Sequence, residues 1–396
     1  GPSKIYSLYL IKISMNICKH FSECGGCRFQ DIDYPNQLVT KEDKVRELTV
    51  SLEVPVYPRP IKSGEPWYYR NKMEFSFGVS DGRVACGLYS KVKRRQLVDI
   101  EECLIFSPDA ALVLAAVKDF ASKNDYPVHD KYSHRGFLRN LLIRETKFTN
   151  QLMVGIVTTS TEKFDQDEFV KVLRNLKLKS EVKSVFQIVN DSLSDAVIFQ
   201  EKKLLYGEPF IIEELGEFRF KVGIDSFFQV NPPMAVELYR AIRDAASLTQ
   251  DQRVLDIFCG LGSIGINLAK AAKFVWGVEM TPEIIDLAWE NAKLNHVDNI
   301  SFFVSDARQF LNTQGAFYKD SDLLVVNPPR CGLSQKLVRA ILRLNPKKII
   351  YSSCNPTALF TDLRGLLDQY KLEFIGPFDF FPHTAHLEVL TFLQLK

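Results

Sequence analysis

The hydrophobic and polar positions follow two different patterns along the 396-residue chain. Between about residues 56 and 220, short segments alternate apolar with polar residues and are separated by Gly, Asp and Asn, as on either side of Asp81-Gly82. Such alternation is typical of strands with one buried face, and Asp-Gly favours a tight hairpin because both residues tolerate a positive φ. Helical spacing of apolar residues occurs near 108–123 and 165–176. This half is predicted to be a mixed α+β domain with mostly antiparallel strands.

From residue 253 onward, short unbroken apolar runs alternate with stretches of helical period. Strands that alternate with helices form a parallel sheet covered on both faces, so the carboxy-terminal half is predicted to be a Rossmann-like α/β domain. We expect this domain at 221–396 and the mixed domain at 16–220, with the boundary near 217–223. The runs predict strands at 253–258, 274–279, 300–304, 322–327 and 347–351, and the other stretches predict helices at 263–272, 282–294, 334–344 and 356–368.

The start of the chain and its composition exclude several classes of protein. Gly1-Pro2-Ser3 is typical of what a protease leaves after tag removal, and the apolar stretch 5–13 predicts a first strand or a leader, so 1–15 is set apart as tag remnant and leader. No apolar run approaches the roughly 20 residues that span a bilayer. With 46% apolar residues the chain is not disordered, and eight cysteines are too few for a disulfide scaffold. We expect a monomeric cytoplasmic protein with reduced thiols.

A glycine turn follows the first strand of the predicted parallel sheet. This strand runs into Cys259-Gly260-Leu261-Gly262-Ser263 and then into a helix. Glycines there allow a sharp turn and let a ligand approach the helix end, outside the carboxyl edge of the sheet. Glu279 ends the next strand, where a carboxylate can accept hydrogen bonds from ribose hydroxyls. An ordinary turn is the alternative, because the three-glycine dinucleotide fingerprint is absent.

A second segment reaches the same edge of the sheet. Asn327-Pro328-Pro329-Arg330 follows the fourth strand, and its two prolines hold the backbone open while the Asn327 amide can face a planar group. With Asp256, Glu279 and the glycine turn, this segment resembles the core of S-adenosylmethionine-dependent methyltransferases. Amine methyltransferases have a similar Asn-Pro-Pro-aromatic sequence, but Arg330 disfavours stacking of an adenine or cytosine there.

Two further residues are candidates for direct chemistry. Cys354 lies at a strand-to-helix turn, where the helix dipole is expected to lower the thiol pKa and favour the thiolate. Glu388 begins a final apolar strand, where burial would raise its pKa towards that of a useful base. Taken singly, each has an alternative: Cys354 could be a buried core thiol and Glu388 a solvated carboxylate.

Five segments together resemble the RNA uracil-5 methyltransferase family, in the family's order: 226–232 (SFFQVNP), 256–260 (DIFCG), 327–330 (NPPR), 352–355 (SSCN) and 383–388 (HTAHLE). The resemblance implies that Cys354 is the nucleophile and Glu388 the base. The thiolate would add to carbon 6 of uracil, carbon 5 would attack the methyl group of S-adenosylmethionine, and the base would remove the carbon-5 proton. It also implies a cofactor and uracil pocket lined by Gln229, Phe258, Glu279, Asp306 and Asn327.

One position departs from the family, because most members carry Asp where this chain has Asn327. The Asn form resembles the branch that acts on 23S ribosomal RNA and lacks an amino-terminal OB-like domain, for which we expect no room before Cys18. The alternatives are a transfer-RNA uracil methyltransferase, an amine or cytosine methyltransferase, and an inactive RNA-binding iron–sulfur scaffold. Cys331 is the rival nucleophile, since cytosine-5 RNA methyltransferases place a cysteine after their Pro.

Four cysteines form a second candidate site. Cys18-x5-Cys24-Gly25-Gly26-Cys27 places three thiols within ten residues, and Cys103 follows the predicted hairpins. Such a set can surround one metal centre, with zinc or iron–sulfur as the candidates. The family resemblance implies a 4Fe–4S cluster, whose role would be structural or an RNA contact because methyl transfer moves no net electrons. The remaining Cys86 and Cys259 are interpreted as packing thiols.

The formal net charge of +2 conceals a strongly basic region. Between Arg59 and Arg95, nine Lys or Arg residues outnumber three acidic ones, and six aromatic residues are interleaved with them. This mixture combines phosphate attraction with base stacking, although it also fits a solvated hairpin face. RNA is therefore the predicted partner, with the target uridine flipped out of a loop. A second basic stretch contains Lys131, Arg135, Arg139, Arg144 and Lys147.

Replacing Lys93, Arg94 and Arg95 with Glu is expected to weaken RNA binding by at least about tenfold at low salt, because phosphate attraction becomes repulsion. S-adenosylmethionine affinity should stay unchanged. Electrophoretic RNA binding and calorimetry of cofactor binding measure the two effects, and loss of both would indicate misfolding instead.

Overall fold

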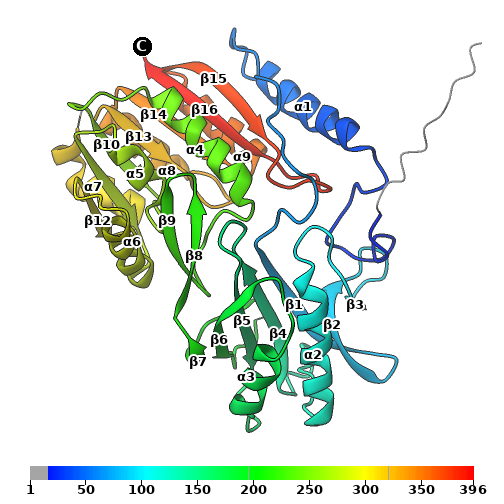
Figure 1. Cartoon of the computed structure of the whole chain (residues 1–396). Coiled ribbons are helices and arrows are strands. Elements are labelled where there is room, and N and C mark those ends of the chain that lie inside the picture. The colour runs from blue at the N-terminus through cyan, green and yellow to red at the C-terminus, as the bar shows by residue number, and fades with distance from the viewer. Residues whose placement is uncertain (1–16, 195, 320) are drawn as a thin grey trace, which may run out of the picture.

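The computed structural model of the chain describes residues 17–194, 196–319 and 321–396. These residues form two seven-stranded sheets, one from each half of the sequence, and one two-stranded hairpin (Figure 1). The predicted tag remnant and leader at 1–15 lie outside the described residues. None of the helices in these ranges has both the length and the apolar character that a membrane crossing requires.

The amino-terminal sheet has the strand order β3-β2-β1-β4-β5-β6-β7 and is antiparallel except between β5 and β6. Asp81 and Gly82 have φ values of 49° and 73° and form the predicted hairpin turn. Helices α2 (Asp109–Lys123) and α3 (Gln166–Arg174) pack against one face, close to their predicted bounds. The strands are β1 (Lys72–Ser80), β2 (Arg83–Tyr89), β3 (Leu97–Asp99), β4 (Leu138–Glu145), β5 (Gln151–Thr158), β6 (Glu181–Val189) and β7 (Glu201–Gly207).

The carboxy-terminal sheet has the order β12-β11-β10-β13-β14-β16-β15, and its first five strands are parallel. Strand β16 runs antiparallel between β14 and β15. Helices cover both faces, so the predicted Rossmann-like α/β arrangement is confirmed. The strands are β10 (Arg253–Ile257), β11 (Phe274–Glu279), β12 (Ile300–Val304), β13 (Leu323–Val326), β14 (Lys348–Ser353), β15 (Tyr370–Phe378) and β16 (Glu388–Leu395).

Helices α4, α5 and α6 lie on one face of this sheet, and α7, α8 and α9 lie on the other. The pattern predicts α5, α6, α8 and α9 within a few residues of their observed bounds, but it does not predict α4 or α7. The helices are α4 (Pro232–Ala246), α5 (Ser263–Ala269), α6 (Pro282–Leu294), α7 (Ala307–Gln314), α8 (Gln335–Leu344) and α9 (Pro356–Leu366).

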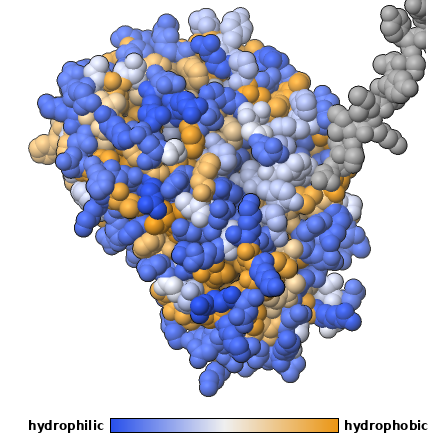
Figure 2. Space-filling model, in the orientation of Figure 1, coloured by the Kyte–Doolittle hydropathy of each residue, from blue (hydrophilic) through white to orange (hydrophobic). Residues whose placement is uncertain are grey.

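The hairpin of β8 (Phe210–Leu215) and β9 (Phe218–Gly223) lies between the two sheets (Figure 1). The boundary expected near 217–223 falls on β9, and the division into two domains stays a prediction. Figure 2 shows that hydrophilic residues cover most of this face of the molecule, while hydrophobic residues gather mainly over its lower half.

Helix α1 (Tyr34–Val50) lies against the carboxy-terminal half, although it comes early in the sequence (Figure 1). Its four buried residues are spaced by four, and all of them except Val45 are polar. They are Gln37, Lys41, Val45 and Thr49. Val45 joins the hydrophobic core beneath α8 and α9. The sequence pattern does not predict this helix, because the face that it buries is mostly polar.

A buried ion pair attaches α1 to the segment between β15 and β16. Lys41 Nζ lies 2.6 Å from Asp379 Oδ1, and the two side chains are 2% and 0% exposed. Lys41 also donates to the carbonyl oxygen of Phe381 at 3.0 Å, and the Tyr34 hydroxyl donates to Asp379 Oδ2 at 2.9 Å. Because burying a charge is costly, these extra hydrogen bonds are needed to offset the desolvation of the pair.

Lys41→Met is expected to lower the free energy of unfolding by ~3–5 kcal/mol, because it leaves the Asp379 carboxylate buried without its partner. Urea denaturation measures the change. Arg46→Met is the matched control on the same helix, since its ion pair with Asp43 is exposed and contributes at most ~1 kcal/mol. Equal losses in the two variants would contradict a special role for the buried pair.

Candidate active site

The turn after β10 bends tightly against the sheet. Phe258, Gly260 and Gly262 have φ values of 64°, 53° and 77°. A Cβ atom on Gly262 would lie 2.7 Å from Cζ of Phe302, so only glycine fits there. The backbone N–H of Gly265 donates to Asp256 Oδ2 at 3.1 Å, which ties the first turn of α5 to the end of β10.

Two carboxylates lie at the ends of adjacent strands beside this turn. Asp256 is fully buried, and burial, with a smaller effect of Glu279, raises its pKa to about 7. Its Oδ1 atom has no hydrogen-bond partner among the described residues. Glu279 is half-buried, and its Oε1 accepts from the backbone N–H groups of Met280 and Thr281 at 2.8 and 3.2 Å. The end of β10 thus holds a buried carboxyl with one oxygen that no described residue satisfies.

The other three predicted pocket residues come from separate elements. Asn327 is half-buried directly after β13, which pairs with β10. Asp306 is exposed after β12 and caps α7 by accepting from the Gln309 N–H at 2.9 Å. Gln229 is buried before α4, and its carbonyl oxygen accepts from Nδ2 of Asn71 at 2.8 Å. The carboxyl edge of the sheet is therefore shared by Phe258, Glu279, Asp306 and Asn327, whereas Gln229 lies in the segment between β9 and α4.

Cys354 is half-buried between β14 and α9, as predicted. The positively charged side chain of Arg330 is close enough to act on its thiol. The backbone of Arg330 is itself fixed, because its carbonyl oxygen accepts from Asn355 Nδ2 at 2.8 Å. Burial, together with nearby Glu388, raises the thiol pKa, while Arg330 acts in the opposite direction. The expectation that the helix terminus would lower this pKa is wrong, since desolvation has the larger effect.

Glu388 is the first residue of β16 and is 3% exposed. Burial raises its pKa to about 7, against a hydrogen bond from the Ser352 hydroxyl that favours the ionised form. The predicted effect of burial on this carboxyl is therefore confirmed. Strands β14 and β16 are hydrogen-bonded neighbours, which brings Glu388 close enough to influence the Cys354 thiol. A thiol and a carboxyl of raised pKa thus lie near each other at two strand ends.

The segment before Glu388 is fixed by residues from the amino-terminal part of the chain. Gln37 accepts from the His383 N–H through Oε1 at 3.0 Å, and its Nε2 lies 3.2 Å from His383 Nδ1. The His383 carbonyl oxygen accepts from the N–H groups of Arg28 and Phe29 at 2.8 and 3.1 Å. The His383 ring stacks on Trp67 with centroids 4.0 Å apart. Sequence reasoning misses Gln37 and Trp67, because no local signal links them to a segment more than 300 positions away.

His386 and Cys331 complete the surroundings of Arg330. Nη2 of Arg330 lies 3.1 Å from His386 Nδ1, and burial lowers the pKa of His386. Cys331, the rival nucleophile, is exposed, and its sulfur lies 3.7 Å from the carbonyl oxygen of Gly332. Cys354, in contrast, is half-buried and lies close enough to Arg330 and Glu388 for both to act on its thiol.

The four candidate ligand cysteines are half-buried, and none is in a disulfide. Burial raises the pKa of Cys103 to about 12, and the thiols of Cys27, Cys24 and Cys18 contribute to this shift, so the fold brings all four into one neighbourhood. Within the described ranges, however, no set of three or more His, Cys, Asp or Glu side chains has a geometry suited to a metal ion.

Three residues of the second basic stretch are structural and do not form a binding surface, which corrects the prediction for them. Arg139 is buried and donates to the carbonyl oxygens of Asn190, Ser192 and Ser194. Arg144 is 2% exposed and donates to the Ser226 carbonyl at 2.6 Å. Lys147 pairs with Glu145 at 2.7 Å.

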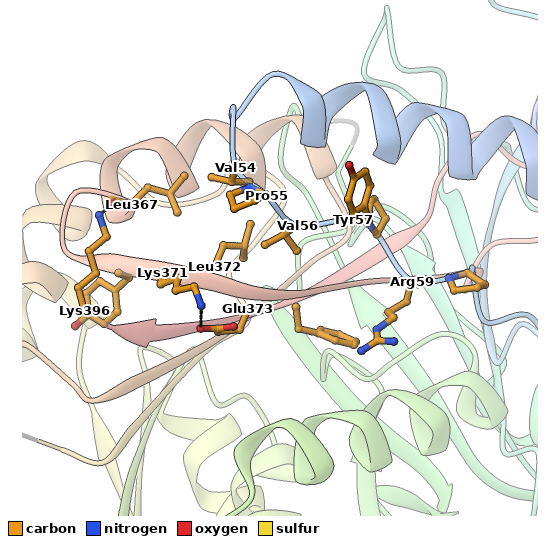
Figure 3. A pocket seen from close by; sticks show the side chains of 14 residues that line it. Val54, Pro55, Val56, Tyr57, Arg59, Leu367, Lys371, Leu372, Glu373 and Lys396 are labelled. Atoms are coloured by element: carbon orange, nitrogen blue, oxygen red, sulfur yellow. Dashed lines mark hydrogen bonds and ion pairs between the residues drawn. The ribbon is translucent and has the colours of Figure 1, made fainter.

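A large hollow lies away from all these groups. A cavity of about 760 Å³ lies between the segment 54–60, strand β15 and Lys396. Figure 3 shows the side chains that line it. Lys371 and Glu373 on its floor pair with each other at 2.8 Å. Because none of the candidate catalytic or cofactor residues lines this cavity, it is not part of the candidate site.

Comparison with known proteins assigns the chain to a family. The tRNA (uracil-5-)-methyltransferase family matches residues 33–396. The chain belongs to this family. It is 36% identical over 381 residues to an uncharacterized RNA methyltransferase of Caldanaerobacter subterraneus subsp. tengcongensis, covering 95% of this chain and 84% of that protein. An uncharacterized RNA methyltransferase of Halalkalibacterium halodurans is 35% identical over 383 residues, covering 96% and 83%.

The fold of this uracil-5-methyltransferase family member also matches a solved structure. The Pyrococcus abyssi tRNA (uracil-54, C5)-methyltransferase in complex with S-adenosyl-L-homocysteine superposes with a TM-score of 0.76 and 28% sequence identity. The match covers 93% of this chain and 86% of that chain. The chain is thus an RNA methyltransferase of the family that the sequence motifs indicate, with the expected class I fold.

Glu388→Gln is expected to stabilise the protein increasingly as pH rises from about 4.5 to above 7. Because the Glu388 pKa is higher in the folded than in the unfolded chain, the neutral carboxyl stabilises the folded protein at low pH. As the pH rises and the buried carboxyl ionises, the free energy of unfolding of the unaltered protein falls by up to ~3 kcal/mol. Urea denaturation of both proteins across this range measures the difference. Glu181→Gln, at a side chain that is 66% exposed, should give a much smaller pH dependence, and a constant difference for Glu388→Gln would refute the shifted pKa.

Proposed function

We propose that this chain transfers the methyl group of S-adenosylmethionine to carbon 5 of a uridine in RNA, with 23S ribosomal RNA as the first candidate target. The observation that carries the proposal is the meeting of Cys354 and Glu388 at the carboxyl edge of the sheet in a member of the uracil-5 methyltransferase family. A protein that only binds RNA needs neither a nucleophile nor a proton acceptor there.

In the proposed mechanism, Cys354 as thiolate forms a bond to carbon 6 of the uracil. Carbon 5 gains electron density and bonds to the methyl group that S-adenosylmethionine would supply when bound, while the bond from that methyl group to the sulfonium sulfur breaks and S-adenosyl-L-homocysteine is left. Glu388 then takes the proton from carbon 5, and the bond between Cys354 and carbon 6 breaks, which restores the double bond and the thiolate. Burial and Glu388 both raise the pKa of the Cys354 thiol, and the positive charge of Arg330 lowers it and so favours the thiolate.

We place the cofactor beside the glycine turn that follows β10. Asp256 Oδ1 is a buried acceptor without a partner among the described residues, and the positive φ angles at Phe258 and Gly260 form the tight turn that a bound ligand would face. The P. abyssi relative binds S-adenosyl-L-homocysteine, the product form of the cofactor. We assign Gln229, Phe258, Glu279, Asp306 and Asn327 to the cofactor and the uracil.

We assign the four thiols of Cys18, Cys24, Cys27 and Cys103 to a 4Fe–4S cluster, with zinc as the alternative. The chemistry of the donor set suits either group, because four thiols outside disulfides influence one another at one place in the fold, although the described side chains do not have the geometry of a metal site. Since methyl transfer needs no electrons, the cluster would be structural. Anaerobic purification tests the choice: a brown protein with bound iron and sulfide supports the cluster, and a colourless one with stoichiometric zinc overturns it.

The RNA target is the open choice within the proposed activity. The Asn327 form and the cysteines favour 23S ribosomal RNA, whereas the P. abyssi relative is a transfer-RNA enzyme. Incubating the protein with unmodified ribosomal RNA and transfer RNA, then mapping 5-methyluridine, decides between them. Methylation at a cytosine or at an amine would refute the proposal, and no methylation of any RNA would favour an inactive scaffold.

Cys354→Ala is expected to abolish methylation, and Glu388→Gln to lower turnover by ~10²–10⁴-fold while a covalent RNA–protein adduct accumulates. The adduct forms because the carbon-5 proton cannot leave, so the thiol stays bonded to carbon 6. Denaturing electrophoresis with radiolabelled RNA detects it. Cys331→Ala is the matched control and should retain activity, whereas full activity of Cys354→Ala would contradict the assignment.

A further inference from the structure

We propose that Tyr89 and Tyr132, with Arg95 and Lys131, form a stacking platform for unpaired nucleotides that flank the target uridine. This inference rests on the proposed function and names the part of the surface that holds the substrate. The ligand is single-stranded RNA, recognised through the faces of its bases and through its phosphates.

The two tyrosine rings come from separate segments and meet around one lysine. Tyr89 ends β2 and is 42% exposed, and Tyr132 lies between α2 and β4 and is 55% exposed. Lys131 Nζ lies 4.3 Å from the centroid of the Tyr89 ring and 5.5 Å from that of the Tyr132 ring. The Arg95 guanidinium carbon lies 4.7 Å from the Tyr132 centroid. Two partly exposed aromatic rings therefore alternate with two cations, which is the combination that binds stacked bases and their phosphates.

Hydrogen bonds fix the loops that carry the platform. In the loop after β2, the Ser90 hydroxyl accepts from the N–H groups of Val92 and Lys93 at 3.1 and 3.0 Å. In the loop before β4, Asp130 Oδ1 accepts from the N–H groups of Tyr132 and Ser133 at 3.1 and 2.6 Å. Because the rings are already oriented, RNA binding would cost little ordering of the protein.

The charge around the platform favours RNA over a protein partner. The loop 90–96 contains Lys91, Lys93, Arg94 and Arg95 and no acidic residue, and all four cations are exposed. Protein interfaces are depleted of lysine at their centre, whereas contacts with phosphates depend on such clusters. Among the residues of this loop only Val92 is a large exposed hydrophobic one.

A short series of hydrogen bonds connects the platform to the candidate active site. The Tyr89 carbonyl oxygen accepts from the Gly25 N–H at 3.0 Å, and Lys91 Nζ donates to the Cys27 carbonyl at 3.2 Å. Arg28, which follows Cys27 in the sequence, donates its backbone N–H to the His383 carbonyl oxygen at 2.8 Å. The loop 24–28, which contains Cys24 and Cys27, thus lies between the platform and the segment that leads to Glu388. Nucleotides stacked on the platform would be held in register with the proton acceptor while the target uridine is unstacked.

The test uses the full chain with both rings replaced, Tyr89→Leu and Tyr132→Leu, and a short fluorescein-labelled single-stranded RNA as the probe. We expect fluorescence anisotropy to show at least about tenfold weaker binding, because each base–ring stack is lost. The dependence of binding on salt should stay close to that of the unaltered protein, since no phosphate-binding charge is removed. Unchanged RNA affinity of the double variant would overturn the platform.

Two controls separate stacking from other effects. Tyr89→Phe with Tyr132→Phe keeps both rings and should bind as the unaltered protein does. Tyr57→Leu removes a tyrosine that is 88% exposed beside β15, away from the platform, and should also leave binding unchanged. Equal weakening by the Phe pair would overturn stacking in favour of hydroxyl contacts.

Methylation is measured in parallel, so that failure of the platform and failure of the proposed function can be told apart. If the Leu pair raises KM for RNA and leaves kcat unchanged, the platform is supported. If the unaltered protein binds the RNA through these rings but methylates no RNA, the platform stands and the proposed function fails. If the Leu pair methylates with unchanged KM, the platform is overturned and the proposed function stands.

Discussion

The buried ion pair between Lys41 and Asp379 is the interaction on which the arrangement of the candidate site depends. Two charges without access to water are tolerated only when their remaining hydrogen-bonding capacity is satisfied, and here Tyr34 and the carbonyl of Phe381 do so. The pair places helix α1 against the segment that leads to Glu388. From that position Gln37, four residues earlier on the same helix face, reaches His383. A helix near the start of the sequence thereby orients a segment of the candidate site near its end.

Burial also sets the chemistry of the two central groups, and it acts on them with different consequences. It raises the pKa of Glu388 to about 7, which suits a group that must accept a proton near neutral pH. The same desolvation raises the pKa of Cys354, which opposes formation of the thiolate. Arg330 acts in the opposite direction, mainly through its positive charge. The three residues therefore function as one electrostatic unit.

The fold could be predicted where the spacing of apolar residues along the chain follows which side chains are buried. Strands β11 and β12 and helix α6 have their predicted bounds, because fully buried strands give unbroken apolar runs and an amphipathic helix gives a period of 3.6. Helix α1 was missed because it buries Gln37, Lys41 and Thr49, whose partners lie elsewhere in the chain. Buried Arg139 was assigned to a basic surface for the same reason, since only the fold shows the three carbonyl groups that it binds.

For the candidate site, the sequence by itself determined which residues stand at strand ends. Alternation of strands and helices predicts a parallel sheet, and the carboxyl ends of parallel strands lie at one edge. That edge is where the sequence places Phe258, Glu279, Asn327 and Cys354. The family followed from the same segments and was confirmed by comparison. Only the tertiary structure decided how far burial shifts the pKa values of Cys354 and Glu388, and which distant side chains fix the segment before Glu388. Desolvation and hydrogen bonds between remote residues depend on packing in three dimensions, which leaves no periodic trace in the sequence.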